Sequence, residues 1–205
     1  MKRELIITIF LFICSSALYA QTEPTESVTS KFYFPALIGI GIPLDNDHTI
    51  LKHGSILNTA LEFRPVYVNA FFFRFNYDAL NNSYVSPMVN LPTNVVKGKL
   101  SANFFVAGAG YRWQFKKIGV YALLQPGLGT RYFNKAVLTP DGISIENITN
   151  SSFSVKTSTG IEYYIVKHFA LIAEPSFYKL FSGRGFNNSH SQISSISIGI
   201  TTTLF

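Results

Sequence analysis

Apolar side chains alternate with small or polar ones along most of this chain, and this period of two limits the possible fold more than any other feature. In "NAFFFRFNYD", residues 69–78, one face carries only aromatic rings, at Phe71, Phe73, Phe75 and Tyr77. Arg74 falls on the opposite face. Successive side chains point to opposite sides of a β-strand, whereas a helix repeats every 3.6 residues. The segment is therefore predicted to be a strand with one continuous apolar face.

Seven further segments alternate in the same way, which brings the expected number of strands to eight. Four of them alternate strongly, at residues 56–64, 104–115, 152–164 and 195–205. Three are weaker, at residues 32–42, 120–132 and 169–178. Pro126 and Pro175 stand inside the last two. A bulge or a weakened ladder is expected there because proline lacks a backbone N–H.

The connectors between these segments alternate between long and short. The long ones are residues 43–54, 79–98, 134–150 and 182–192, and the short ones lie at 65–66, 116–117 and 166–168. In an antiparallel up-and-down sheet, this order puts every long connector at one end and every tight turn at the other. We therefore expect an all-β fold, an eight-stranded antiparallel up-and-down transmembrane β-barrel with both termini at the turn end.

The face opposite the apolar one carries the charges and most of the glycines. We predict a luminal polar network that comprises Glu62, Arg64, Arg74, Asp78, Arg131, Lys156, Glu162 and Glu174. A lysine or arginine on the lipid-facing side costs roughly 2–4 kcal/mol at the bilayer midplane, which fixes the phase of the pattern. Acids and bases are mixed in this set, so they can pair inside the lumen. Arg74 is expected to be neutralised by one of the three glutamates.

The apolar face is expected to meet lipid. Its aromatic side chains suit the girdles at the membrane boundaries, and the lipid-facing aromatic residues are predicted to be Phe71, Phe73, Phe75, Tyr111 and Trp113. A soluble barrel of the lipocalin kind is the alternative, because it has similar length and connectivity but turns its apolar face inward around a ligand. Glycines on the charged face favour the membrane barrel, since small side chains suit a narrow lumen.

Bulky residues are expected to share the lumen with the charges. They are Phe72, Phe104, Leu123 and Tyr164. Eight strands leave an interior barely wide enough for side chains. A filled lumen is therefore favoured over a narrow pore, which stays open as an alternative.

Residues 1–20 have the pattern of a secretory signal peptide, with Lys2 and Arg3 before an apolar stretch and small residues up to Ala20. Residues 21–30 are expected to form a short N-terminal segment, and residues 31–205 the barrel domain. Cleavage after Ala20 would remove Cys14, the only cysteine, whereas a lipoprotein would keep it as an anchor. The net charge of +6 is scattered along the chain, which argues against nucleic acid as a partner.

With its signal peptide, its eight strands and its terminal Phe205, the chain resembles the small outer-membrane β-barrel families of Gram-negative bacteria, of the OmpA-transmembrane or OmpX type. The junction of Ala20 with Gln21 and the glycine-aromatic strands are similar to barrel proteins of the Bacteroidota. The resemblance implies the cell outer membrane as location, with lipopolysaccharide and the barrel-insertion machinery as partners. The usual assembly signal places its last aromatic residue on the outward phase, whereas Leu204 holds that phase here.

Some barrels of this size are lipid A deacylases or palmitoyltransferases, and the deacylases carry a His-x-Ser-Asn stretch on a strand. The nearest segment here is His190 followed by Ser191 in a polar connector, and adjacent residues of an extended chain point to opposite faces. Asp45, Asp47, His48 and His53 lack the spacing of a calcium or zinc site. A single arginine between glycines, Arg184, is a weak anion signal.

The expected function is that of an integral outer-membrane protein with a structural, adhesion or envelope-interaction role, without catalysis, cofactor or metal. An unknown surface or envelope protein is the expected partner, bound through the long connectors, because loops on a rigid scaffold usually carry specificity. The alternatives are a lipid A-modifying enzyme, a narrow pore and an accessory barrel of a secretion system.

Overall fold

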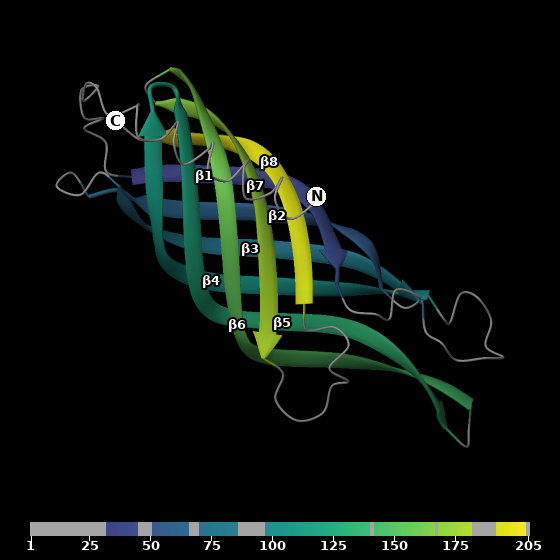
Figure 1. The fold of residues 1–205 in the computed structure, drawn as a ribbon. Coiled ribbons are helices and arrows are strands. Elements are labelled where there is room, and N and C mark those ends of the chain that lie inside the picture. The colour runs from purple at the N-terminus through teal and green to yellow at the C-terminus, as the bar shows by residue number, and fades with distance from the viewer. Residues whose placement is uncertain are drawn as a thin grey trace, which may run out of the picture.

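The computed structural model describes residues 32–44, 51–65, 70–85, 97–139, 142–166, 168–181 and 192–203. These residues form eight antiparallel strands that pair in chain order, and β8 pairs with β1 to close the barrel (Figure 1). The strands are β1 (Phe32–Pro43), β2 (Leu51–Phe63), β3 (Phe71–Val85), β4 (Lys97–Phe115), β5 (Ile118–Thr139), β6 (Gly142–Val166), β7 (Phe169–Phe181) and β8 (Gln192–Thr203). The predicted eight-stranded antiparallel up-and-down barrel is confirmed. In the part of the chain that is described, we find no helix with the length and apolarity needed to span a membrane.

One end of the barrel carries the tight turns, and we call it the turn end. There β4 joins β5 through Lys116 and Lys117, and His168 lies in the turn that leads into β7. Lys116 has a φ of 51°, a left-handed conformation that allows the chain to reverse within two residues. The first residues of β1 and the last of β8 lie at the same end, where Tyr33 pairs with Thr203. We call the opposite end the far end.

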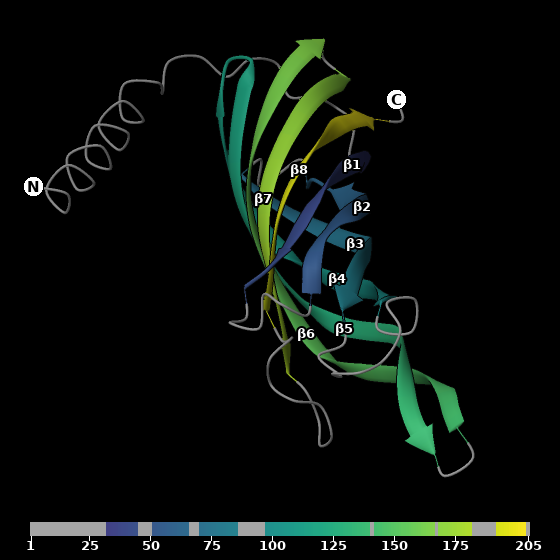
Figure 2. The same ribbon diagram turned by 90° about the vertical axis from the view of Figure 1, so that its right-hand side faces the viewer.

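The segment 134–150 was predicted to be a long connector, and this prediction is wrong. β5 continues to Thr139 and β6 begins at Gly142, and the two strands stay in one register from Ile118 and Tyr163 out to this last pair. In Figure 2 this hairpin projects beyond the other strands at the far end. The strand pairs were hidden in the sequence because asparagines and a proline break the alternation there.

The outer part of this hairpin extends past its neighbours. The ladder of β4 with β5 ends at the pair of Leu100 with Phe133, and that of β6 with β7 ends at Phe153 with Phe181. Beyond these pairs, β5 and β6 pair only with each other among the strands described. β2 and β3 also extend into residues 51–54 and 79–85, which were predicted to be connectors.

Pro126 and Pro175 weaken the ladders without bending them into bulges. Pro126 pairs with Val155 on one side, but on the other side the ladder of β4 with β5 is interrupted and resumes in the same register. Pro175 pairs with Ile196 and leaves a similar gap towards β6. The missing N–H accounts for both gaps. The register shifts among the described strands lie elsewhere, between Leu51 and Gly54 and between Tyr164 and Val166.

Inward-facing glycines make room for bulky neighbours inside the barrel. A Cβ on Gly110 would lie 2.3 Å from Cζ of Phe72, and a Cβ on Gly160 would lie 2.2 Å from Cζ of Tyr121. The rings of β3 and β5 thus lie over glycines of the next strand, and both rings are almost completely buried. This arrangement lets a narrow barrel hold aromatic side chains in its lumen.

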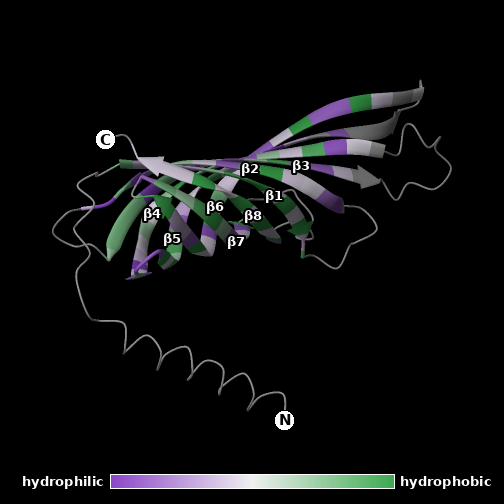
Figure 3. Ribbon diagram, turned by 90° about the horizontal axis from the view of Figure 1, so that it is seen from above, coloured by the Kyte–Doolittle hydropathy of each residue, from purple (hydrophilic) through white to green (hydrophobic). Residues whose placement is uncertain are grey.

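The outer surface is mostly apolar from the turn end to a polar boundary in the far half, and Thr59, Thr157 and Thr159 are exposed threonines within it. Figure 3 shows apolar and polar residues alternating along the strands, as expected for one inward and one outward face. The outward polar residues that form this boundary are Ser55, Asn81, Asn103, Thr130, Ser151, Lys179 and Ser194. Several are bonded to one another or to neighbours along this boundary, such as Ser101 Oγ to Asn81 Oδ1 at 2.7 Å.

We expect the substitution Gly160→Ala to destabilise the barrel. The added methyl group would overlap the ring of Tyr121, which is 1% exposed and has nowhere to move. Overpacking of this kind costs about 1–3 kcal/mol. Urea unfolding of the purified protein, followed by gel mobility, measures the change. Gly119→Ala is the matched control, because its Cβ would lie 3.1 Å from the Glu162 carboxylate and needs only a small shift; equal midpoints for the two variants would contradict this account.

Candidate functional site

Charged side chains from five strands meet inside the turn half of the barrel. They form a chain in which acids and bases alternate, and we call it the charge chain. Its members, in order from the barrel middle to the turn end, are Asp78, Lys156, Glu174, Arg74, Glu62, Arg64, Glu162 and Arg112. Seven of them reach the lumen because they lie on the inward phase of a strand, and Arg64 follows directly after β2; all but Arg112 are buried.

The inner half of the charge chain is centred on Lys156 and Arg74. Lys156 Nζ donates to Asp78 Oδ2 at 2.9 Å and lies 3.2 Å from Glu174 Oε1. Arg74 Nη1 donates to Glu174 Oε2 at 2.7 Å, and its Nε donates to Glu62 Oε2 at 2.6 Å. The hydroxyl of Tyr121 also donates to Glu174. Both cations therefore bridge two carboxylates.

The outer half of the charge chain approaches the turn end. Glu62 accepts a second bond, from Arg64 Nε, and Arg64 Nη2 donates to Glu162 Oε1 at 2.8 Å. Arg112 Nη1 lies 3.5 Å from Glu162 Oε2 and donates to the Tyr164 hydroxyl at 2.7 Å. Arg64 also stacks over the Tyr33 ring, with 3.6 Å between guanidinium carbon and centroid.

The charge chain joins opposite walls of the barrel. Arg74 on β3 contacts Glu174 on β7, and Arg64, the residue directly after β2, contacts Glu162 on β6. Its acids and bases are equal in number, so the buried charges compensate one another. Removing one member would leave a partner charged in a place that water does not reach freely, which typically costs about 3–5 kcal/mol.

The predicted luminal residues all lie inside the barrel. All of them except Arg131 belong to the charge chain, namely Glu62, Arg64, Arg74, Asp78, Lys156, Glu162 and Glu174, whereas Arg131 is buried in the far half, on β5. Two of the three glutamates contact Arg74, and Glu162 contacts Arg64 instead. The sequence analysis missed Arg112, although its inward phase on β4 was a usable signal. It also missed the hydroxyls of Tyr121 and Tyr178, which donate hydrogen bonds to carboxylates.

Apolar side chains fill the lumen beyond the charge chain. They are Ile56, Leu80, Leu100, Ala102, Phe104, Val106, Tyr178, Leu180 and Ile193, which we call the far cluster. The rings of Phe104 and Tyr178 lie 4.8 Å apart, and the hydroxyl of Tyr178 donates to Asp78 at 2.9 Å. This hydroxyl connects the far cluster to the charge chain. The bulky residues Phe72, Phe104, Leu123 and Tyr164 all point inward and are buried.

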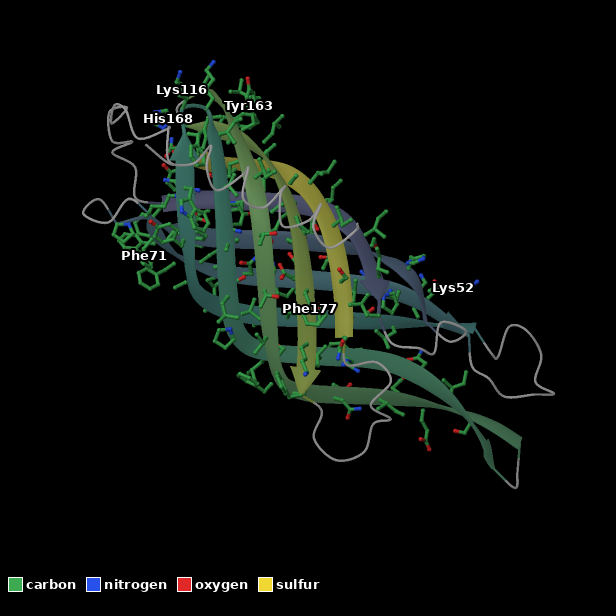
Figure 4. All side chains as sticks on the ribbon, in the orientation of Figure 1. Lys52, Phe71, Lys116, Tyr163, His168 and Phe177 are labelled. Atoms are coloured by element: carbon green, nitrogen blue, oxygen red, sulfur yellow. The ribbon has the colours of Figure 1, made fainter. Side chains whose placement is uncertain are left out.

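The predicted lipid-facing aromatic residues all lie on the outer surface. Phe71, Phe73, Phe75, Tyr111 and Trp113 are between 37% and 55% exposed. Ring centroids of Phe71 and Tyr111 lie 5.0 Å apart, and those of Tyr111 and Trp113 4.7 Å. Figure 4 shows Phe71 and Tyr163 pointing away from the barrel near the turn end, with Lys52 at the far end.

Most of the weaker candidates lie outside the described residues. These are the signal peptide at 1–20, Asp45, Asp47, His48, Arg184, His190, Ser191, Leu204 and Phe205. His53 is described and lies exposed on β2. Across the described ranges, no three histidine, cysteine, aspartate or glutamate side chains are grouped so that they could hold a metal ion.

The fold is similar to that of solved outer-membrane barrels. Neisserial surface protein A matches with a TM-score of 0.58 at 15% identity, over 84% of this chain and 97% of that one. Ail of Yersinia pestis, in a complex with the heparin analogue sucrose octasulfate, matches with 0.54 at 14% identity, over 85% and 99%. OprG of Pseudomonas aeruginosa matches with 0.53 at 9% identity, over 85% and 96%. No family model and no curated protein sequence matches the chain.

We expect Glu62→Gln to destabilise the folded barrel by about 3–5 kcal/mol, because Arg64 and Arg74 would both lose a buried counter-charge. Equilibrium unfolding in urea, in detergent micelles or bilayers, measures the difference. Glu146→Gln is the matched control, since Glu146 is exposed on the β5–β6 hairpin and its loss should change stability by less than about 0.5 kcal/mol. Similar values for the two variants would rule out the charge chain as a stabilising element.

A filled lumen predicts that the protein does not conduct steadily. The charge chain occupies the turn half of the lumen and the far cluster occupies the other half. Recordings in a planar bilayer with the purified protein should therefore show no steady single-channel steps. Regular steps of uniform size from the wild-type protein would contradict a filled lumen and favour the narrow pore.

Proposed function

We propose that this chain is an integral outer-membrane protein that binds partner proteins at the cell surface through its β5–β6 hairpin. The observation that supports this best is the contrast between an apolar outer wall and a hairpin that continues beyond it. The apolar side chains of the outer wall would be in contact with lipid, whereas the hairpin would be surrounded by water and could contact other proteins. The likeness of the fold to outer-membrane barrels agrees with this location.

The dimensions of the apolar wall agree with a bilayer. Outward side chains are apolar over residues 71–79 of β3, 105–113 of β4 and 169–177 of β7. A tilted strand needs about 9–11 residues to cross the hydrocarbon core. Aromatic rings lie at the turn end of this wall, and hydrogen-bonded polar side chains lie at its other boundary. Short turns face the periplasm in such barrels and longer elements face outward, which gives the orientation.

The β5–β6 hairpin would then stand outside the cell. Between the polar boundary at Thr130 and the end of β5 at Thr139, the strand rises roughly 30 Å. Ile145 on the hairpin is 67% exposed, an apolar side chain in a place where lipid does not cover it. Segments that a rigid scaffold holds out into solvent usually carry the binding residues of a protein. A structural or adhesive role through protein contacts follows.

Lipopolysaccharide and the barrel-insertion machinery are the other partners that this function requires. Lys99 and Lys179 lie exposed at or just beyond the polar boundary, on β4 and β7. Ammonium groups at this level would meet the phosphates of lipopolysaccharide in the outer leaflet. Insertion into the membrane would follow cleavage of the signal peptide.

Cysteine labelling tests the location and the orientation. In intact Gram-negative cells, Ile145→Cys should react with a maleimide that does not cross the outer membrane, because the hairpin is exposed outside. Lys117→Cys, in the turn between β4 and β5, is the matched control and should react only after the membrane is permeabilised. Absence of the protein from the outer-membrane fraction, or the reverse labelling pattern, would refute the proposal.

Shortening the hairpin tests the binding role. Replacing residues 136–145 by Asn-Gly would close the hairpin next to the pair of Lys135 and Glu146, because this dipeptide favours a two-residue β-turn. Cells that display the wild-type chain should attach to cultured epithelial cells, and cells with the shortened variant at the same surface level should attach several-fold less. Equal attachment by both would rule out the hairpin as the binding element.

A further inference from the structure

A β-bulge near the far end of β2 brings two basic residues together on the outer surface. Because of the register shift between β2 and β3, Lys52 and His53 both lie opposite Ser83, and both are exposed. The Asn82 side-chain amide donates to the carbonyl oxygen of Lys52 at 2.6 Å. A Cβ on Gly54 would lie 2.2 Å from a carbonyl oxygen of β3, so only glycine fits beside the bulge. The bulge is therefore held in place from both strands.

A third basic residue adjoins the bulge from the other side of β3. Lys99 on β4 pairs with Ser83 and is exposed. Neighbouring strands lie about 4.7–4.9 Å apart, so Lys52 and Lys99 flank β3 at a backbone separation of about 10 Å, which two flexible four-carbon side chains can span. The acids described on β2, β3 and β4 are Glu62 and Asp78, and both are buried in the lumen. We call the following residues the basic platform: Lys52, His53, Ser83 and Lys99.

Polar side chains next to the basic platform can donate hydrogen bonds to an anion. Asn81 lies two residues before Ser83 on the same face of β3, and Ser101 Oγ donates to its Oδ1 at 2.7 Å. Because the oxygen of Asn81 is the acceptor in this bond, its N–H groups can donate to a ligand. Ser55 pairs with Asn81 from β2 and is exposed. Charge-assisted bonds from lysine, together with neutral donors, are the contacts that bind a phosphate group.

An apolar groove begins beside these polar residues and runs towards the turn end across β8, β1, β2 and β3. Ser55 and Asn81 line the end of the groove that adjoins the basic platform. The groove has a volume of about 620 Å³, within the usual range of ligand sites. Its apolar lining faces outward and consists of Ile38, Ile40, Leu57, Ala79, Ile196 and Ile198. The outer surface thus holds an apolar groove directly against the basic platform.

The combined chemistry selects an occupant that is anionic at one end and apolar at the other. Inorganic phosphate would leave the groove empty, and an uncharged hydrocarbon chain would leave the lysines unmatched. A second copy of this chain would bring more lysines to the same level, because Glu146, on the projecting hairpin, is the only exposed acid among the described residues. A lipid with a phosphorylated headgroup fits both parts, with its phosphate on the basic platform and an acyl chain in the groove.

We propose that the basic platform and the groove together bind one molecule of lipopolysaccharide, through a phosphate and an acyl chain of its lipid A part. The choice of lipid rests on the proposed function, which puts the far end at the outer leaflet, where lipopolysaccharide lies. The site differs from general contact with the membrane because Lys52, His53 and Lys99 are fixed around one residue, Ser83, by the bulge and the strand pairing. One phosphate can therefore meet several basic groups at once.

Native mass spectrometry tests the basic platform. Wild-type protein released from detergent micelles that contain diphosphorylated lipid A should keep one lipid A molecule per chain. Lys52→Ala and Lys99→Ala should each lower this retention several-fold, because each removes one of the two ammonium groups at the phosphate. Lys179→Ala is the matched control and should not change it, since this lysine lies at the same level on the opposite wall, where its ladder partners Val155 and Gln192 are uncharged. Equal retention by all variants, or equal loss in all three, would overturn the site.

Two alanine-to-leucine variants test the groove without changing any charge. Ala79→Leu puts a larger side chain into the groove and should lower the retention of lipid A several-fold. Ala107→Leu is the matched control, because Ala107 is exposed on the outer wall of β4 and does not line the groove. Heat-dependent gel mobility shows that each variant is folded. Unchanged retention by a folded Ala79→Leu variant would overturn the role of the groove.

Other probes with the wild-type protein separate the possible ligands. Lipid A without its phosphates should be retained several-fold less, and inorganic phosphate should not displace diphosphorylated lipid A. Displacement by inorganic phosphate would indicate a site for the free ion, and equal retention of phosphatidylglycerol would indicate a site for any anionic lipid; either result would overturn the assignment. These measurements depend on neither the hairpin nor the orientation in the cell. Loss of the lipid site with the expected cysteine labelling would therefore leave the proposed function standing, and reversed labelling would refute that function even if lipid A is retained.

Discussion

Closure of the sheet by β8 and β1 is the constraint on which the rest of the structure depends. The pairing runs without a break from Tyr33 with Thr203 to Pro43 with Ile193. A closed sheet leaves no unpaired edge along the apolar wall, so backbone groups are satisfied where water would be absent. Closure also divides every strand into an inner and an outer face. Each side chain must then suit either a narrow lumen or the surroundings of the barrel.

The narrow lumen explains the pairing of glycines with rings and of acids with bases. Phe72 and Tyr121 fit only because Gly110 and Gly160 carry no side chain beneath them. Charges in the same space have no bulk water to stabilise them, and each carboxylate of the charge chain contacts a cation within the barrel. The stability of the interior and the absence of conductance that we expect thus have the same physical origin, a lumen filled to its width.

The β5–β6 hairpin is longer than is needed to line the apolar wall, and its outer part projects beyond the neighbouring strands. β7 ends at Phe181 and β4 pairs with β5 only as far as Leu100, but β5 and β6 stay paired in one register to Thr139 and Gly142. A hairpin anchored in a rigid barrel loses little freedom when it meets a partner, which favours binding. In the proposed function, the barrel would hold the chain in the membrane and the hairpin would offer the binding surface.

The sequence by itself determined the number of strands, the inward or outward phase of the alternating segments and the charges that share the lumen, with the exception of Arg112. All of these follow from the period of two, which is a local property of an extended chain. The tertiary structure alone decided which charges meet, so that Glu162 lies against Arg64 and not Arg74. Contacts across a barrel depend on the stagger of its strands, which alternation does not encode. For the same reason the extension of β5 and β6 through an asparagine-rich segment became visible only when both strands were seen in register.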